Sequence, residues 1–154
     1  MRQMLIAAAL AALLSQPHCA FAQAPSPDYD PALAKHVGAD EYGMRNYVLV
    51  ILKTGPNKMP AGPERDAMFK GHFANIARLS AEGMLALAGP FEGTEGWRGM
   101  FIFAVTEIDQ ARQLVATDPV VVRGEMVPEF HKYYGSAALM LVNDAHPKVA
   151  QKRF

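Results

Sequence analysis

Two side chains in this sequence, those of His72 and Asp118, have the chemistry of a general acid–base pair. His72 follows Gly71 in a predicted helix and, at about 100° per residue, lies within the apolar arc of that helix. The other members of this arc are Met68, Phe69, Phe73, Ile76 and Leu79. An ionisable ring on this face needs a polar partner, because it points towards the interior. Asp118, which precedes Pro119 at the end of a second helix, is the best candidate for that partner.

Both residues also have a structural interpretation. A single histidine on a helix is often a residue at the edge of the core that makes one structural hydrogen bond. An aspartate before a proline often starts a turn, and its carboxylate then caps nearby backbone amides. Asp118 can cap and also bind His72, so its two roles are compatible.

The elements that position these residues follow the order strand, helix, strand, strand, helix, strand. The strands are predicted at residues 45–53, 84–88, 99–105 and 126–134, and the helices at 63–82 and from residue 106 onwards. This order predicts an α+β, ferredoxin-like βαββαβ fold, in which a four-stranded antiparallel sheet carries both helices on one face. Pro128 restricts the fourth strand to an edge, a bulge or an irregular start.

Local signals mark the ends of the two predicted helices. Pro63 is expected as the first residue of the first helix, and Gly83 as its left-handed C-terminal cap. Thr106 and Asp109 form a pattern that resembles a capping box at the start of the second helix.

The first and third predicted strands carry apolar side chains on both faces. The helices cover only one face of the sheet, so a second copy of the chain laid against the other face would bury it. This pattern predicts a homodimer.

The chain resembles the YCII-related domain family in the order of three short motifs. These are Gly71-His72-Phe73, Ala88-Gly89-Pro90-Phe91 and Thr117-Asp118-Pro119-Val120. The likeness to this family of YciI-like, small ferredoxin-like proteins, which pair into dimeric α/β barrels, covers residues 45–134. It implies that His72 and Asp118 are the catalytic pair. It implies no single reaction, because none is common to the family.

Other residues are candidates for substrate binding. Gly89 and Pro90 end the second strand and are expected to shape the rim of the pocket. Arg65 lies about two turns before His72 and is a candidate to bind an anionic substrate, although an arginine in a first helical turn is usually solvated. His131 lies on the fourth strand and is a candidate to point into the cavity, if the register near Pro128 allows it.

We expect neither a metal nor a cofactor. The scattered histidines show no ligand spacing, and the single cysteine, Cys19, lies in the leader described next.

Residues 1–22 have the features of a signal peptide. Arg2 precedes a short apolar run, and Ala20-Phe21-Ala22 supplies a small-x-small cleavage step. The run is too short for a membrane span, so we expect export to the periplasm or the medium and no stable membrane insertion after cleavage. Residues 23–44 are then predicted as an extended N-terminal segment, and residues 135–154 as a C-terminal tail.

The charge balance argues against a nucleic-acid partner. The 154 residues contain 15 basic and 15 acidic side chains. A protein that binds the phosphate backbone needs a basic surface, and no basic stripe is visible.

These observations favour an exported enzyme that acts on a small organic molecule by lyase or isomerase chemistry, with His72 and Asp118 as an acid–base pair. The alternative is a non-catalytic protein of the same fold that binds a small molecule in the same cavity. A third possibility is an accessory domain whose C-terminal tail contacts a partner.

Overall fold

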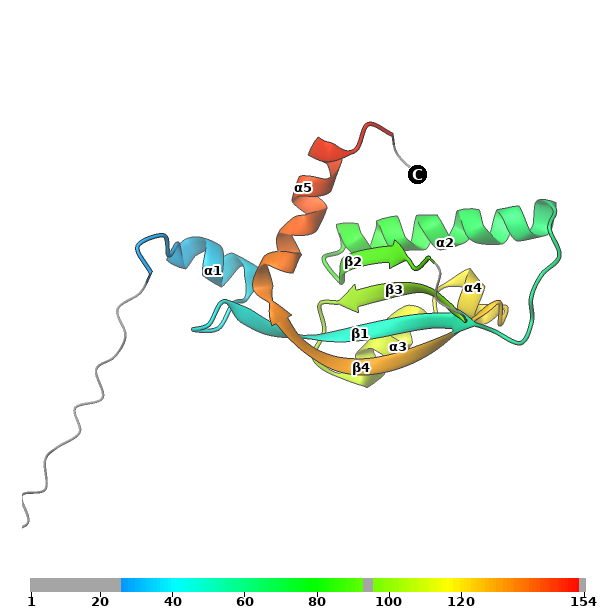
Figure 1. Ribbon diagram of the computed structural model, residues 1–154, viewed down its shortest axis with the longest axis horizontal. Helices are drawn as coiled ribbons and strands as arrows, with labels where there is room; N and C mark the ends of the chain where they lie inside the picture. Colours follow the sequence, from blue (N-terminus) through cyan, green and yellow to red (C-terminus); the bar gives the residue numbers. More distant parts are fainter. Residues whose placement is uncertain (1–25, 93–95, 153–154) are drawn as a thin grey trace, which may run out of the picture.

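The computed structural model describes residues 26–92 and 96–152 (Figure 1). The elements are α1 (Pro31–Val37), β1 (Met44–Thr54), α2 (Pro63–Ala81), β2 (Leu85–Pro90), β3 (Trp97–Phe103), α3 (Ile108–Val115), α4 (Pro119–Val122), β4 (Met126–Ser136), the 3-10 helix η1 (Ala137–Leu141) and α5 (Val142–Val149). The strands pair in the order β2-β3-β1-β4, and every pair is antiparallel. This confirms the predicted α+β, ferredoxin-like fold.

The central strand β1 owes its position to apolar side chains on both faces. Val48, Val50 and Leu52 face α2 and α3 and are buried in the larger core with Phe101 and Phe103 of β3. The strand β4 lies at the edge of the sheet. Pro128 has no backbone N–H, and an edge strand tolerates this because no further strand pairs with its outer side. The prediction of an edge strand is therefore confirmed.

The long helix α2 begins and ends as its sequence predicts. Pro63 is at its first turn, where Glu64 and Asp66 also stabilise the positive end of the helix dipole. After the last helical residue, Gly83 takes a left-handed backbone with φ of +71°. The face turned to the sheet buries His72 and Asn75 between Met68 and Leu79.

The segment after β3 differs from the prediction in two details. Glu107, rather than Thr106, is the N-cap of α3, and no side chain caps that helix end, so the expected capping box does not form. Residues 119–122, for which the sequence predicts no regular element, form the short helix α4. Its N-cap is Asp118, whose carboxylate accepts a hydrogen bond from the Val120 amide.

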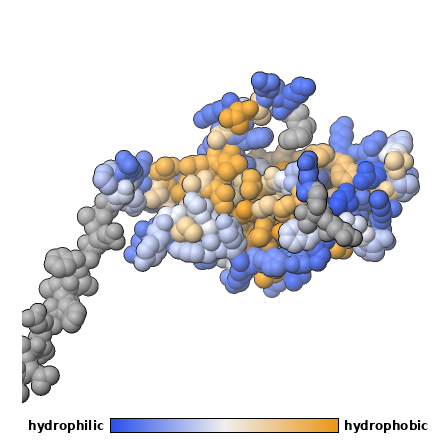
Figure 2. Space-filling model, viewed as in Figure 1, coloured by the Kyte–Doolittle hydropathy of each residue, from blue (hydrophilic) through white to orange (hydrophobic). Residues whose placement is uncertain are grey.

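The C-terminal residues predicted as a tail are part of the fold. The strand β4 runs to Ser136, and η1 then packs against the sheet face opposite α2 and α3. There Leu139 and Met140 lie against Tyr47 and Ile102. Hydrophobic residues gather in the middle of the face that Figure 2 shows, with hydrophilic residues towards its ends.

The N-terminal segment, predicted to be extended, contains a helix. Residues 31–37 form α1, because Asp30 caps its first amides, Pro31 suits its first turn and Gly38 ends it in a left-handed conformation. This helix lies beyond one end of the sheet, near η1 (Figure 1). The predicted signal peptide lies outside the described residues. Within the described part of the chain, no helix has the length and apolar character to cross a bilayer.

Candidate active site

The side chains of His72 and Asp118 are in direct contact. Nδ1 of His72 lies 2.7 Å and 2.9 Å from the two carboxylate oxygens of Asp118. Asp118 is fully buried and His72 is 8% exposed. The two residues are 46 positions apart in the sequence, so their meeting depends on the packing of α2 against α4.

Gly71 allows this packing. A Cβ atom placed on Gly71 would lie 3.0 Å from Cγ of Pro119, which is closer than almost all real contacts of this kind. A larger residue would hold α2 away from α4 and with it His72 away from Asp118. The motifs Gly71-His72 and Asp118-Pro119 therefore form the two sides of one contact.

A second set of polar contacts holds the residue before Asp118. Oδ1 of Asn75 accepts hydrogen bonds from Nη2 of Arg78, at 2.8 Å, and from the hydroxyl of Thr117, at 3.0 Å. Asn75 lies three residues after His72, on the same face of α2. These contacts tie the helix that carries His72 to the segment that carries Asp118.

The contact with Asp118 determines which nitrogen of His72 can react. A carboxylate accepts hydrogen bonds, so Nδ1 carries the proton and the neutral ring has its lone pair on Nε2. Within the described residues Nε2 has no hydrogen-bond partner, whereas every polar side-chain atom that is shut off from solvent has one. Nε2 therefore remains accessible, and His72 lines a pocket.

This pocket has a volume of about 560 Å³ and an apolar wall. Leu52, Phe69, Ile76, Phe101 and Met126 are among its lining residues. The rings of Phe69, Phe73 and Phe101 also lie 5.4–6.1 Å from the imidazole of His72. The only ionisable side chains among the described lining residues are those of His72, Arg98 and His146. A ligand of mainly apolar character fits this lining.

The predicted binding residues divide into two groups. Gly89 and Pro90 line the pocket. Arg65 and His131 do not line it. His131 pairs with Leu49 in the register of β1 and β4 and thus lies on the opposite face of the sheet, where Nε2 is 2.8 Å from Glu129. His131 therefore does not point into this pocket.

Arg65 belongs to a buried ion cluster around Glu125. Nη2 of Arg65 lies 3.2 Å from Glu125, whose carboxylate also accepts a hydrogen bond of 2.6 Å from the Met59 amide. Arg98 approaches the same carboxylate to 3.7 Å. Burial raises the pKa of Glu125, but the Met59 amide and the two guanidinium groups outweigh it and lower the pKa below its usual value. Glu125 is therefore a buried anion shared by two cations.

Three residues of this region were not predicted from the sequence: Arg98, Glu125 and His146. Glu125 and Arg98 are single charged residues without any periodic pattern, and no local signal could have connected them. His146 lies on α5, within the segment predicted as a tail. Asn143 holds this helix to β2 through a hydrogen bond of 2.7 Å from its side-chain amide to the carbonyl of Leu85.

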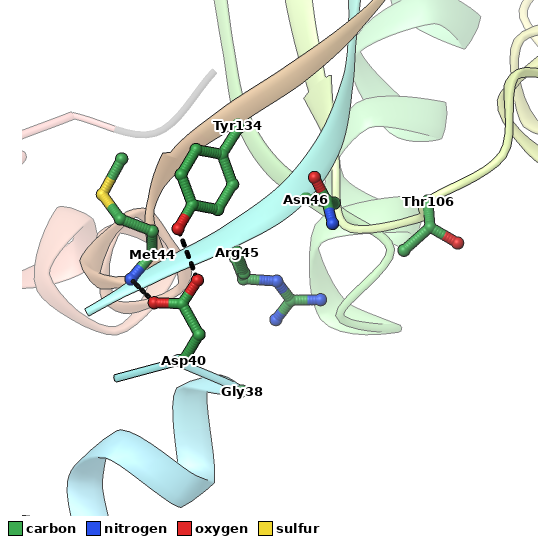
Figure 3. A pocket seen from close by; sticks show the side chains of 7 residues that line it. All are labelled: Gly38, Asp40, Met44, Arg45, Asn46, Thr106 and Tyr134. Carbon is green, nitrogen blue, oxygen red and sulfur yellow. Dashed lines mark hydrogen bonds between the residues drawn. The ribbon is translucent and has the colours of Figure 1, made fainter. Parts of the chain in front are cut away.

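A second pocket, of about 280 Å³, lies where α1 meets the sheet (Figure 3). Its two charged groups are each already bound: Asp40 accepts hydrogen bonds from Tyr134 and the Met44 amide, and Arg45 donates to the carbonyls of Val37 and Ala104. The hydrogen bonds from Tyr134 and the Met44 amide lower the pKa of Asp40. These contacts hold the N-terminal segment against the sheet, so we assign this pocket a structural role.

Metal ligands do not converge in the described ranges, which contain no group of three or more His, Cys, Asp or Glu side chains placed to hold an ion. The fold and the site thus define a small ferredoxin-like α+β protein with a buried His–Asp pair beside an apolar pocket.

No family model and no curated protein matches the chain. Among solved structures, the chain is similar to 5-chloro-2-hydroxyhydroquinone dehydrochlorinase (TftG) from Burkholderia phenoliruptrix AC1100, in its complex with 2,5-dihydroxybenzoquinone. The two proteins are 17% identical, with a TM-score of 0.42, over 56% of this chain and 92% of that chain. A likeness this distant says nothing about the activity of the present chain.

Proposed function

We propose that this protein is an enzyme that moves a proton on a small, mainly apolar organic molecule, with Nε2 of His72 as the general base. The observation that carries the proposal is the contact of Nδ1 with both oxygens of the buried Asp118, beside a pocket that His72 lines. A histidine oriented by a carboxylate at one nitrogen and open at the other has the geometry of a general base.

Asp118 acts in this proposal as the positioning residue. It keeps the proton on Nδ1 and stabilises the imidazolium that forms when Nε2 takes a proton from the substrate. The carboxylate is shut off from water, and three phenyl rings surround the imidazole. The attraction between the carboxylate and the imidazolium is therefore screened less than it would be at the protein surface.

Lyase or isomerase chemistry fits one such pair. Nε2 takes a proton from a C–H bond next to a carbonyl group, and the electron pair of that bond forms an enolate. In an elimination, this electron pair then makes a carbon–carbon double bond as the leaving group departs with its own bonding pair. In an isomerisation, the imidazolium returns the proton to another carbon.

The test measures proton abstraction itself, so the complete reaction does not have to be identified first. The protein in D₂O is incubated with small carbonyl compounds that have acidic C–H bonds, and proton NMR follows deuterium incorporation. We expect exchange with the wild type and a loss of about 100-fold or more in His72→Gln. His131→Gln is the matched control, because His131 also contacts a carboxylate but lies on the other sheet face.

The same experiment separates the enzyme from a binding protein. If a compound binds in the pocket and its C–H bonds do not exchange faster than in buffer, the catalytic proposal is wrong and a binding function remains. If His72→Gln exchanges as fast as the wild type, His72 is not the base.

Two further features belong to this proposal. The chain pairs with a second copy through the sheet face opposite α2 and α3, where Leu49, Leu87 and Met100 are only partly buried. Residues 1–22 direct export and are then removed. Light scattering of the purified mature protein, and mass spectrometry of its N-terminus, test these two statements.

A further inference from the structure

The guanidinium group of Arg98 has hydrogen-bonding capacity that the described residues do not use. Its side chain is 28% exposed, and its nearest ionic neighbour is Oε1 of Glu125, at 3.7 Å. At that distance the two groups form an ion pair but no hydrogen bond. Within residues 26–92 and 96–152, no side chain or carbonyl accepts a hydrogen bond from this group, which could donate five.

An irregularity in the sheet places Arg98 on the side of the pocket. The register pairs Leu52 with Gly99 but Lys53 with Trp97, so Arg98 is an extra residue without a partner in β1. Such a bulge redirects the side chain of the extra residue. Arg98 reaches Glu125, which also binds Arg65 of α2, and therefore lies on the same side of the sheet as α2.

The cluster around Glu125 carries excess positive charge. Two guanidinium groups share a single carboxylate, and that carboxylate already accepts hydrogen bonds from Arg65 and from the Met59 amide. Arg65 also lies over the ring of Phe69, with Cζ 4.6 Å from the ring centre. Arg65 is thus held by two contacts, while Arg98 lines the pocket with its donors unused.

We infer that Arg98 is the substrate-recognition residue of this pocket, and that the substrate class is a small carboxylic acid with an apolar body. The planar guanidinium matches a carboxylate through two parallel hydrogen bonds. The apolar wall takes the rest of the molecule, and His72 on the same wall faces its reacting carbon. Glu125 is the positioning residue that holds the guanidinium. This inference deepens the proposed function, since it names the substrate class of the same site.

The test compares an acid with its neutral counterpart of the same shape. Phenylacetate and phenylacetamide are titrated into the protein by calorimetry, with fluorescence of Trp97, the single tryptophan and the neighbour of Arg98, as a second signal. We expect the wild type to bind the acid at least about tenfold more tightly than the amide. Arg98→Met should weaken binding of phenylacetate by about 10- to 100-fold and change binding of phenylacetamide less than about twofold.

Three variants serve as controls. Arg98→Lys keeps the charge and should retain part of the preference for the acid. Arg123→Met removes the same charge from an arginine that does not line the pocket, and should leave both affinities unchanged. His146→Gln tests another basic side chain on the pocket wall, besides His72, and should preserve the preference.

The inference is overturned if the wild type does not prefer the acid, if Arg98→Met weakens both ligands equally, or if Arg123→Met has the same effect as Arg98→Met. Binding needs no turnover, so the result is independent of the proposed base. A preference for the acid that persists in His72→Gln, without deuterium exchange by the wild type, would support the role of Arg98 and refute that of His72.

Discussion

Gly71 of α2 lies so close to the ring of Pro119 in α4 that a Cβ atom on Gly71 would be only 3.0 Å from Cγ of Pro119. This contact sets the distance between the next residue in α2, His72, and the residue before Pro119, Asp118. The acid–base pair of the candidate site therefore depends on the absence of a side chain at Gly71.

Substitution of Gly71 by alanine tests this dependence. The new Cβ must push the Pro119 ring away by a few tenths of an ångström, which lengthens the contact between His72 and Asp118. Alanine is also the better helix former by about 1 kcal/mol, which offsets part of the strain. We expect a change in stability within about 1 kcal/mol but a clear loss of proton abstraction, measured by denaturant unfolding and by deuterium exchange. Lys70→Ala, at an exposed neighbouring position, is the control. Unchanged exchange in Gly71→Ala would show that the close approach is not needed.

Asp118→Asn separates the structural role of Asp118 from its chemical one. The amide oxygen still caps the Val120 amide, so the start of α4 should survive, at a cost of about 1–3 kcal/mol for the altered contact with the ring. The amide no longer stabilises an imidazolium, and exchange should fall by about 100-fold or more. Nitrogen NMR of the His72 ring reports the change directly: the wild type should carry its proton on Nδ1. If the wild-type ring carries its proton on Nε2, the assignment of the base is wrong.

Glu125 predicts a pH dependence of stability. The pKa of Glu125 is lower in the folded chain than in the unfolded chain. Its ionised carboxylate therefore contributes fully to the free energy of unfolding when the pH is above the usual glutamate pKa. This contribution is lost as the pH falls from the usual glutamate pKa to the lower pKa of the folded chain. We expect the free energy of unfolding of the wild type to fall more steeply with acidification below about pH 5 than that of Glu125→Gln. Denaturant titrations at several pH values measure both slopes. Asp40 and Glu129, whose pKa values are also lowered, contribute equally to both proteins and cancel in the comparison. Parallel slopes would show that Glu125 has no shifted titration.

Asn143→Ala tests whether the C-terminal helix belongs to the pocket. The variant loses the hydrogen bond to the carbonyl of Leu85, at a cost of about 1 kcal/mol, and loosens α5, which brings His146 to the pocket wall. We expect weaker binding of phenylacetate and phenylacetamide alike, because the wall itself becomes mobile. Asp144→Ala, at an exposed position next to it, should change neither affinity. Wild-type affinities in Asn143→Ala would place α5 outside the binding site.

Much of the fold and half of the site follow from local patterns in the sequence. The apolar strands, the caps of α2 and the proline in β4 predict the order of elements and the edge strand, because each acts over a few residues. The position of His72 on the apolar face of a helix predicts a buried ring that needs a partner, and Asp118 is the natural candidate. Gly89 and Pro90 end a predicted strand, which is also a local feature of the sequence, and they are among the residues that line the pocket.

The positions of the other charged residues depend on contacts between segments that are distant in the sequence. The sequence by itself determined that His72 is buried, since helical periodicity fixes which face turns inward. Only the tertiary structure decided that Arg98 lies on the pocket wall, that Arg65 is held by Glu125, and that His131 lies on the far face of the sheet. A bulge, or a shift of the strand register by one residue, moves a side chain from one face of the sheet to the other. A single charged residue has no periodic pattern, so the sequence does not reveal on which face it lies.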